Sequence, residues 1–117
     1  MRIFVSQLNP IIGDLEGNTK KILYALEQAR LSNAELVLFS ELILSGYPPE
    51  DLLLQRTFIE AHSYYLEQII EASSGLIVIL GLVRQSKERA EKSLINSAAV
   101  IYDGKLLGFQ DKQLLPT

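Results

Sequence analysis

Short apolar runs recur along the chain and predict β-strands. They cover residues 2–8, 35–39, 76–82, 94–102 and 105–109, and they are rich in residues that fit a pleated sheet. The run at 35–39 is apolar on both faces, a pattern typical of a strand with other layers on each side. We therefore expect a sheet whose interior strands are buried.

Two longer stretches place apolar residues at helical spacing instead. Asn18 is predicted as the N-cap of the first helix. The second opens at Thr57 with the pattern of a capping box, in which Glu60 reaches back to the Thr57 amide. The apolar positions of the first helix are Ile22, Leu23, Leu26 and Ala29. The resulting order is βαβαβββ, which indicates an α/β fold.

Turn-forming and charged residues separate these elements. Residues 46–49 (Gly-Tyr-Pro-Pro) exclude regular structure because proline lacks an N–H donor, and a short helix is predicted over 50–54. Asp103-Gly104 is typical of a hairpin turn, although the sequence leaves its type open. The charged stretch 84–92 is predicted to be a solvated connection between strands.

Composition then excludes several classes of function. The chain has 117 residues and no cysteine, which removes a disulfide framework and thiol catalysis from within it. The net charge is -3, with acidic and basic residues mixed, so no nucleic-acid partner is expected. No apolar run approaches the roughly 20 residues of a membrane span, and we expect no signal peptide, because the sequence opens in a strand-like run. We expect a cytoplasmic protein without a membrane partner, and without a metal site because His62 stands alone.

Three segments together resemble the nitrilase superfamily, which uses a Glu-Lys-Cys triad. Glu41, within residues 39–41 (Phe-Ser-Glu), comes just after the second strand, where that family carries its glutamate, and residues 111–116 follow a hairpin strand, where it carries its lysine. Within the superfamily, the segment from Gly46 to Leu53 is most similar to the amidase domains of glutamine-dependent NAD synthetases. The resemblance implies that residues 1–117 are the N-terminal part of a single carbon-nitrogen hydrolase domain, part of an α-β-β-α sandwich.

The resemblance also assigns site residues. Glu41 would shuttle the proton, Lys112 would face the developing oxyanion, and Tyr47 would line the pocket for the substrate glutamine. Without the motifs, Glu41 and Lys112 would be interpreted as structural or solvated charges, and packing of the loop accounts for Tyr47 equally well. Ser40 stands where the family usually has proline.

The family's cysteine lies some tens of residues beyond the lysine, whereas this sequence ends five residues after Lys112. We therefore expect a chain truncated before its nucleophile and inactive by itself. In the parent enzyme, ammonia from glutamine would pass to a synthetase domain. ATP and Mg would belong to that domain, since neither glycine-rich nucleotide fingerprint is present here.

Two other interpretations stay open. The chain could belong to a stand-alone nitrilase-like amidohydrolase that acts on another small amide, or it could be a natural short product that serves as a non-catalytic binding or assembly module. Truncation itself would leave apolar surface and strand edges uncovered between residues 76 and 109, because later helices and a facing sheet would be missing. We therefore predict a homo-oligomer or self-association.

Overall fold

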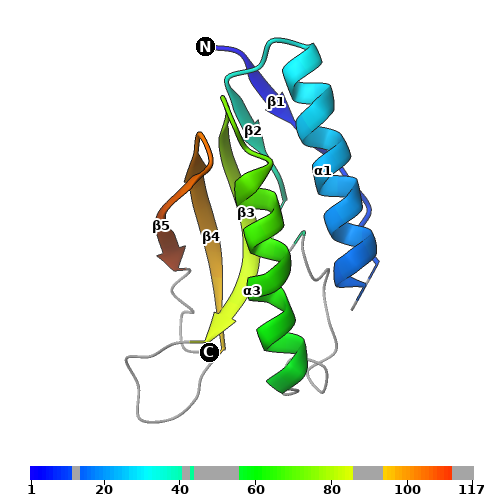
Figure 1. The fold of residues 1–117 in the computed structure, drawn as a ribbon, viewed down its shortest axis with the longest axis vertical. Helices are drawn as coiled ribbons and strands as arrows, with labels where there is room; N and C mark the ends of the chain where they lie inside the picture. The colour runs from blue at the N-terminus through cyan, green and yellow to red at the C-terminus, as the bar shows by residue number, and fades with distance from the viewer. Residues whose placement is uncertain (12–13, 41–42, 44–55, 86–93, 112–117) are drawn as a thin grey trace, which may run out of the picture.

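A computed structural model of the chain describes residues 1–11, 14–40, 43, 56–85 and 94–111. The elements, labelled as in Figure 1, are β1 (Ile3–Val5), α1 (Leu15–Leu31), β2 (Leu36–Leu38), α3 (Arg56–Glu71), β3 (Ile77–Gln85), β4 (Leu94–Tyr102) and β5 (Lys105–Asp111). This order is the predicted βαβαβββ, and the α/β class is confirmed. None of the helices described is long and apolar enough to cross a membrane.

The strands form one mixed sheet in the order β1-β2-β3-β4-β5. The pairs β1–β2 and β2–β3 are parallel, and the pairs β3–β4 and β4–β5 are antiparallel. Parallel neighbours need a long crossover, and α1 and α3 lie in those two connections. Since β5 reverses the direction of β4, it runs the same way as β1, β2 and β3. The C-terminal ends of these four strands therefore reach the same side of the sheet, here called the carboxyl edge.

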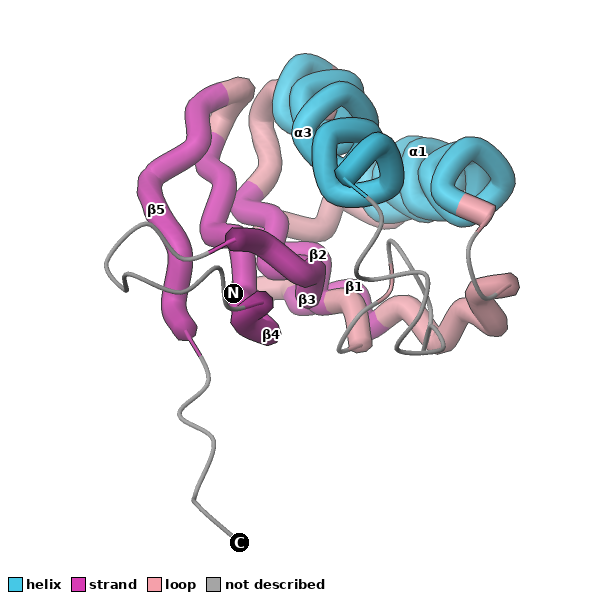
Figure 2. Tube along the Cα trace, turned by 90° about the horizontal axis from the view of Figure 1, so that it is seen from below, coloured by secondary structure: helices cyan, strands magenta, loops and turns pink. Residues whose placement is uncertain are grey.

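Both helices lie side by side over one face of the sheet (Figure 2). The apolar positions on that face alternate along each strand with period two, as a pleated strand requires. Burying each such side chain contributes roughly 1.5–3 kcal/mol relative to leaving it exposed. The large side chains of this core include Ile22, Leu26, Ile43, Ile69, Val37, Val78, Leu80 and Ile101, all 0–1% exposed.

The other face of the sheet is also apolar, and no described element covers it. We call it the open face. Ile3 and Val5 are 57% and 60% exposed on it, and Tyr102 is 53% exposed. Its two rows, set by the strand register, are Ile3, Leu36, Ile77 and Tyr102, and Val5, Leu38, Ile79 and Val100. The predicted layers on both sides of the 35–39 run are found on one side only within the described residues: Val37 is buried on the helix-covered face, whereas Leu38 is 38% exposed on the open face.

The hairpin turn at Asp103-Gly104 is confirmed. Both residues have positive φ, 48° and 81°, as a type I′ turn requires. The turn is fastened to the end of α3, because Gly75 N donates to Asp103 Oδ1 over 2.8 Å and Gly104 N donates to Ser73 Oγ over 3.0 Å. The β4–β5 hairpin is thereby held at the end of the sheet opposite to the carboxyl edge.

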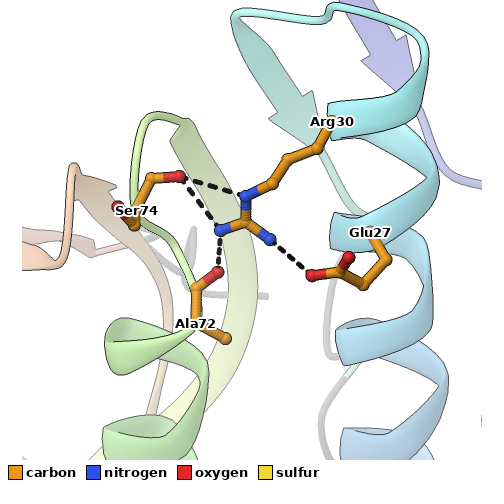
Figure 3. Close-up of polar contacts among 4 residues, drawn as sticks. All are labelled: Glu27, Arg30, Ala72 and Ser74. Atoms are coloured by element: carbon orange, nitrogen blue, oxygen red, sulfur yellow. Dashed lines mark hydrogen bonds and ion pairs between the residues drawn. The ribbon is translucent and has the colours of Figure 1, made fainter.

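An arginine joins the two helices at that same end of the sheet. Arg30, in the last turn of α1, donates to the backbone carbonyl oxygens of Ala72 and Ser74, just beyond α3 (Figure 3). Its Nη1 also contacts Glu27 Oε1 at 2.9 Å. The carbonyl groups at and just after a helix end lack intrahelical partners, so a side chain of α1 satisfies carbonyl groups in the segment that directly follows α3.

The predicted N-cap at Asn18 is wrong. The cap is Asp14, whose Oδ1 accepts from Gly17 N at 3.0 Å, and the helix starts at Leu15. Asn18 lies inside the helix, 1% exposed. Its amide bonds both backbone groups of Ile11, which donates to Oδ1 and accepts from Nδ2 over 2.8 Å each. The buried amide of Asn18 thus holds the loop before the helix. The spacing of residues along the helix does not reveal this contact.

Two further boundaries differ from prediction. The helix α3 already includes Arg56, so the predicted start at Thr57 is wrong, whereas the predicted contact between Glu60 and Thr57 involves a side chain outside the described part. The strand β3 continues to Gln85, which pairs with Leu94, so residues 84 and 85 belong to the ladder rather than to a connection. Backbone pairing in a long hairpin satisfies N–H and C=O groups whatever the side-chain polarity, and this outweighs the charge pattern.

The strand lengths at the sheet margins also differ from prediction. The first strand spans Ile3–Val5 rather than residues 2–8, and β5 continues to Asp111, two residues past the predicted end. The predicted loop at 46–49, the short helix at 50–54 and the connection at 86–92 lie outside the described residues.

Candidate active site at the carboxyl edge

The three residues predicted for the site, Glu41, Tyr47 and Lys112, lie outside the described residues. The structure does describe the backbone that leads to two of them. Ser40 follows β2 directly before Glu41 in the sequence, and Asp111 ends β5 directly before Lys112.

Both leading segments arrive at the carboxyl edge. Phe39 N donates to Ile79 O over 2.9 Å, which extends the pairing of β2 with β3 by one residue. Farther along β3, Leu82 pairs with Ser97, and Ser97 pairs with Asp111. Three strand spacings of about 4.8 Å separate β2 from β5, roughly 14 Å in all. The segments that end at Ser40 and Asp111 therefore both lie at the carboxyl edge. The convergence of Glu41 and Lys112 on one pocket stays a prediction.

Buried apolar residues hold the chain on both sides of positions 41 and 42. Phe39 is 5% exposed and Ile43 is 1% exposed, and both belong to the hydrophobic core. A core at this packing density resists small shifts of its members. The path of the chain into and out of the Glu41 position is therefore anchored by packing.

The end of β5 is held by a polar contact. Ser97 Oγ donates to Asp111 Oδ1 over 2.5 Å, and Ser97 is 5% exposed. The sequence analysis assigned no role to Ser97 or Asp111. Two features of the sequence could have indicated this contact: Ser97 is a hydroxyl residue within a predicted strand, and Asp111 directly precedes the candidate catalytic Lys112.

A third segment at the carboxyl edge is the loop after β1. Asn18 holds the backbone of Ile11 there, and Lys21 Nζ donates to Asn9 O over 2.7 Å. Sequence reasoning missed this function of Asn18 as well. The first turns of α1 thus fix the loop that borders the exit of β2.

One titratable group between the helices has a shifted pKa. Partial burial, and then the Glu16 carboxylate, raise the pKa of Tyr65 above its ordinary value of 10.0. The Tyr65 ring packs edge to face on Tyr64, with centroids 5.0 Å apart. Tyr65 therefore remains a neutral packing residue at physiological pH. No group of three or more potential metal-ligating side chains occurs within the described residues.

Comparison with known proteins shows which family has this sequence and fold. The carbon-nitrogen hydrolase family model matches residues 2–116. Glutamine-dependent NAD(+) synthetase from Thermotoga maritima is 38% identical over 118 residues, and that from Synechocystis sp. is 41% identical over 119 residues. These matches cover 99% and 98% of this chain but 20% and 21% of the relatives. The chain thus spans about a fifth of the length of the relatives it matches.

Solved structures agree with this. A crystal structure of a glutamine-dependent NAD(+) synthetase from Cytophaga hutchinsonii has a TM-score of 0.88 at 32% identity, over 99% of this chain and 19% of that one. An amidase from Nesterenkonia sp. has a TM-score of 0.74 at 24% identity, over 100% of this chain and 44% of that one, and this likeness concerns the fold. The predicted nitrilase-type α/β fold is confirmed, and the chain belongs to the carbon-nitrogen hydrolase family.

Proposed function

We propose that residues 1–117 form part of the amidase domain of a glutamine-dependent NAD synthetase, in which glutamine is hydrolysed and its ammonia passes to a synthetase domain. The observation that carries this is the similarity of nearly the whole chain to two such synthetases. The common carboxyl edge reached by β2 and β5 is compatible with it, because both candidate catalytic residues directly follow described segments at that edge.

The proposed chemistry divides among three groups. A cysteine thiol would attack the amide carbon while Glu41 accepts the thiol proton, Lys112 would stabilise the oxyanion, and Glu41 would return the proton to the nitrogen that leaves as ammonia. The chain contains no cysteine, so under this proposal the nucleophile lies outside these residues. Tyr47 would contact glutamine. ATP and Mg would act in the synthetase domain, and the location would be cytoplasmic.

The test is an ammonia-release assay on the complete gene product that carries this chain. We expect ammonia from glutamine, and glutamine-dependent NAD formation when ATP, Mg and an adenylated nicotinate dinucleotide are supplied. Release from other small amides in preference to glutamine would instead identify a stand-alone amidohydrolase. No release from any amide would indicate a non-catalytic module.

The isolated 117-residue chain supplies a matched comparison. Without a thiol it cannot form the covalent intermediate, so we expect no ammonia release above the buffer blank. Measurable release from glutamine by the purified chain would contradict the proposed division of the triad.

We also propose that the open face of the sheet drives association of the isolated chain. Its exposed apolar side chains include Ile3, Val5 and Tyr102, and large exposed apolar patches mark interaction surfaces. Sedimentation velocity should show dimers or larger species, and a polarity-sensitive dye should bind. Replacing Val5 with Lys should shift the population towards monomer, whereas Tyr24→Lys, at a 66% exposed tyrosine of α1, should not. A monodisperse monomer that binds no dye would contradict this.

A further inference from the structure

A buried serine and a half-buried aspartate are hydrogen-bonded at the end of the hairpin that leads to Lys112. Ser97 lies on the helix-covered face, in the same row as Leu82 of the core. Its Oγ donates to Asp111 Oδ1 over 2.5 Å, a length typical of strong, charge-assisted O–H···O bonds. The contact fastens the last residue of β5 to the neighbouring strand.

This contact depends on a register shift within the hairpin. Next to the turn, Ile101 pairs with Leu106, but beyond an irregularity after Val100 the pairing moves by one residue. Had the first register continued, Ser97 would stand opposite Gln110, and the shift places Asp111 there instead. Bulges of this kind re-aim side chains and are over-represented beside active sites.

We propose that Ser97 and Asp111 are a positioning pair for Lys112. They fix the backbone from which Lys112 departs, so that its ammonium is held where negative charge develops on the substrate oxygen. The inference rests on the proposed function, because it requires Lys112 to act in amide hydrolysis. A shift of Asp111 is transmitted through one peptide bond, and misplacement by about 1 Å can reduce a rate about 100-fold.

The experiment uses the complete gene product with the substitution Ser97→Ala. We expect kcat for ammonia release from glutamine to fall about 10- to 100-fold, with KM for glutamine changed less than about threefold, because the pair acts on the transition state and not on substrate binding. Rates are expressed per active site, titrated with a thiol-reactive glutamine analogue, so that loss of folded protein does not enter kcat.

Ser73→Ala is the matched control. Ser73 is also buried, 0% exposed, and its Oγ donates to Ile70 O over 2.7 Å, but it lies at the opposite end of the sheet. The same substitution there should lower the melting temperature and leave kcat per active site within about twofold. If both serine variants lower kcat per active site equally, the Ser97 effect is general destabilisation and the proposal is overturned.

Two conservative variants complete the test. Ser97→Thr keeps the hydroxyl and should recover kcat per active site to within about threefold of the wild type. Asp111→Asn keeps an oxygen that accepts from Ser97 but removes the charge, so it should fold even if Ser97→Ala does not, and its kcat should be reduced. The proposal is overturned if the two single variants Asp111→Asn and Ser97→Ala both keep the wild-type kcat per active site. If Ser97→Ala is insoluble, a wild-type kcat in Asp111→Asn alone overturns it.

The two levels of inference fail in different ways. A wild-type gene product that releases no ammonia from glutamine overturns the proposed function, and the positioning pair with it. An active wild type whose Ser97 and Asp111 variants keep kcat overturns the positioning pair alone.

Discussion

Replacing Glu41 with glutamine in the complete gene product should lower ammonia release from glutamine by about 100- to 10,000-fold. Glutamine has the shape of glutamate but accepts no proton, and removal of a general acid–base group typically costs a factor in this range. The loss should appear in kcat per titrated active site, with far-ultraviolet circular dichroism unchanged. Continuous ammonia detection at saturating glutamine measures it.

Glu35→Gln is the matched control for Glu41→Gln. Glu35 is exposed and directly precedes β2, at the end of the strand opposite to the carboxyl edge, and its Oε1 accepts a hydrogen bond from Arg2 N over 3.4 Å. We expect activity within about twofold of the wild type. Full activity in Glu41→Gln would remove Glu41 from the catalytic machinery and would leave family membership and the fold intact.

Replacing Arg30 with methionine should destabilise the isolated chain by about 2 kcal/mol, because hydrogen bonds to charged groups typically contribute about 1.5–3 kcal/mol. Methionine keeps much of the apolar stem but removes every donor to the carbonyl oxygens of Ala72 and Ser74 (Figure 3). The Arg30 side chain is only 30% exposed, so water replaces these contacts incompletely. Urea denaturation should show a lower midpoint with an unchanged slope.

Two variants separate this bridge from the ion pair beside it. Arg30→Lys should recover only part of the loss, since one ammonium does not reproduce the planar guanidinium that contacts two carbonyl groups at once. Glu27→Gln should change stability by less than about 0.5 kcal/mol, because Glu27 is 69% exposed and surface pairs contribute little. A stability of Arg30→Met within 0.5 kcal/mol of the wild type would show that the bridge between the helices is energetically neutral.

The candidate site was only partly accessible from the sequence. Family-like segments selected Glu41 and Lys112, and the topology brings the strands before them to one edge. The contacts that support the site could not be predicted from the sequence, because each of them joins two segments that only the tertiary structure brings together. Ser97 and Asp111 meet because of a register shift between β4 and β5, and no residue pattern on either strand alone specifies that shift. Asn18 was misassigned for a related reason, since its two hydrogen bonds go to the loop at Ile11.

The sequence by itself determined the order of helices and strands and the turn at Asp103-Gly104, because apolar periodicity and turn chemistry act over a few neighbouring residues. Only the tertiary structure decided where β3 and β5 end, which face the helices cover, and which polar side chains hold the carboxyl edge. Those features depend on pairing between residues far apart in the chain. Their energies come from satisfying backbone groups and burying apolar surface together, which no local window contains.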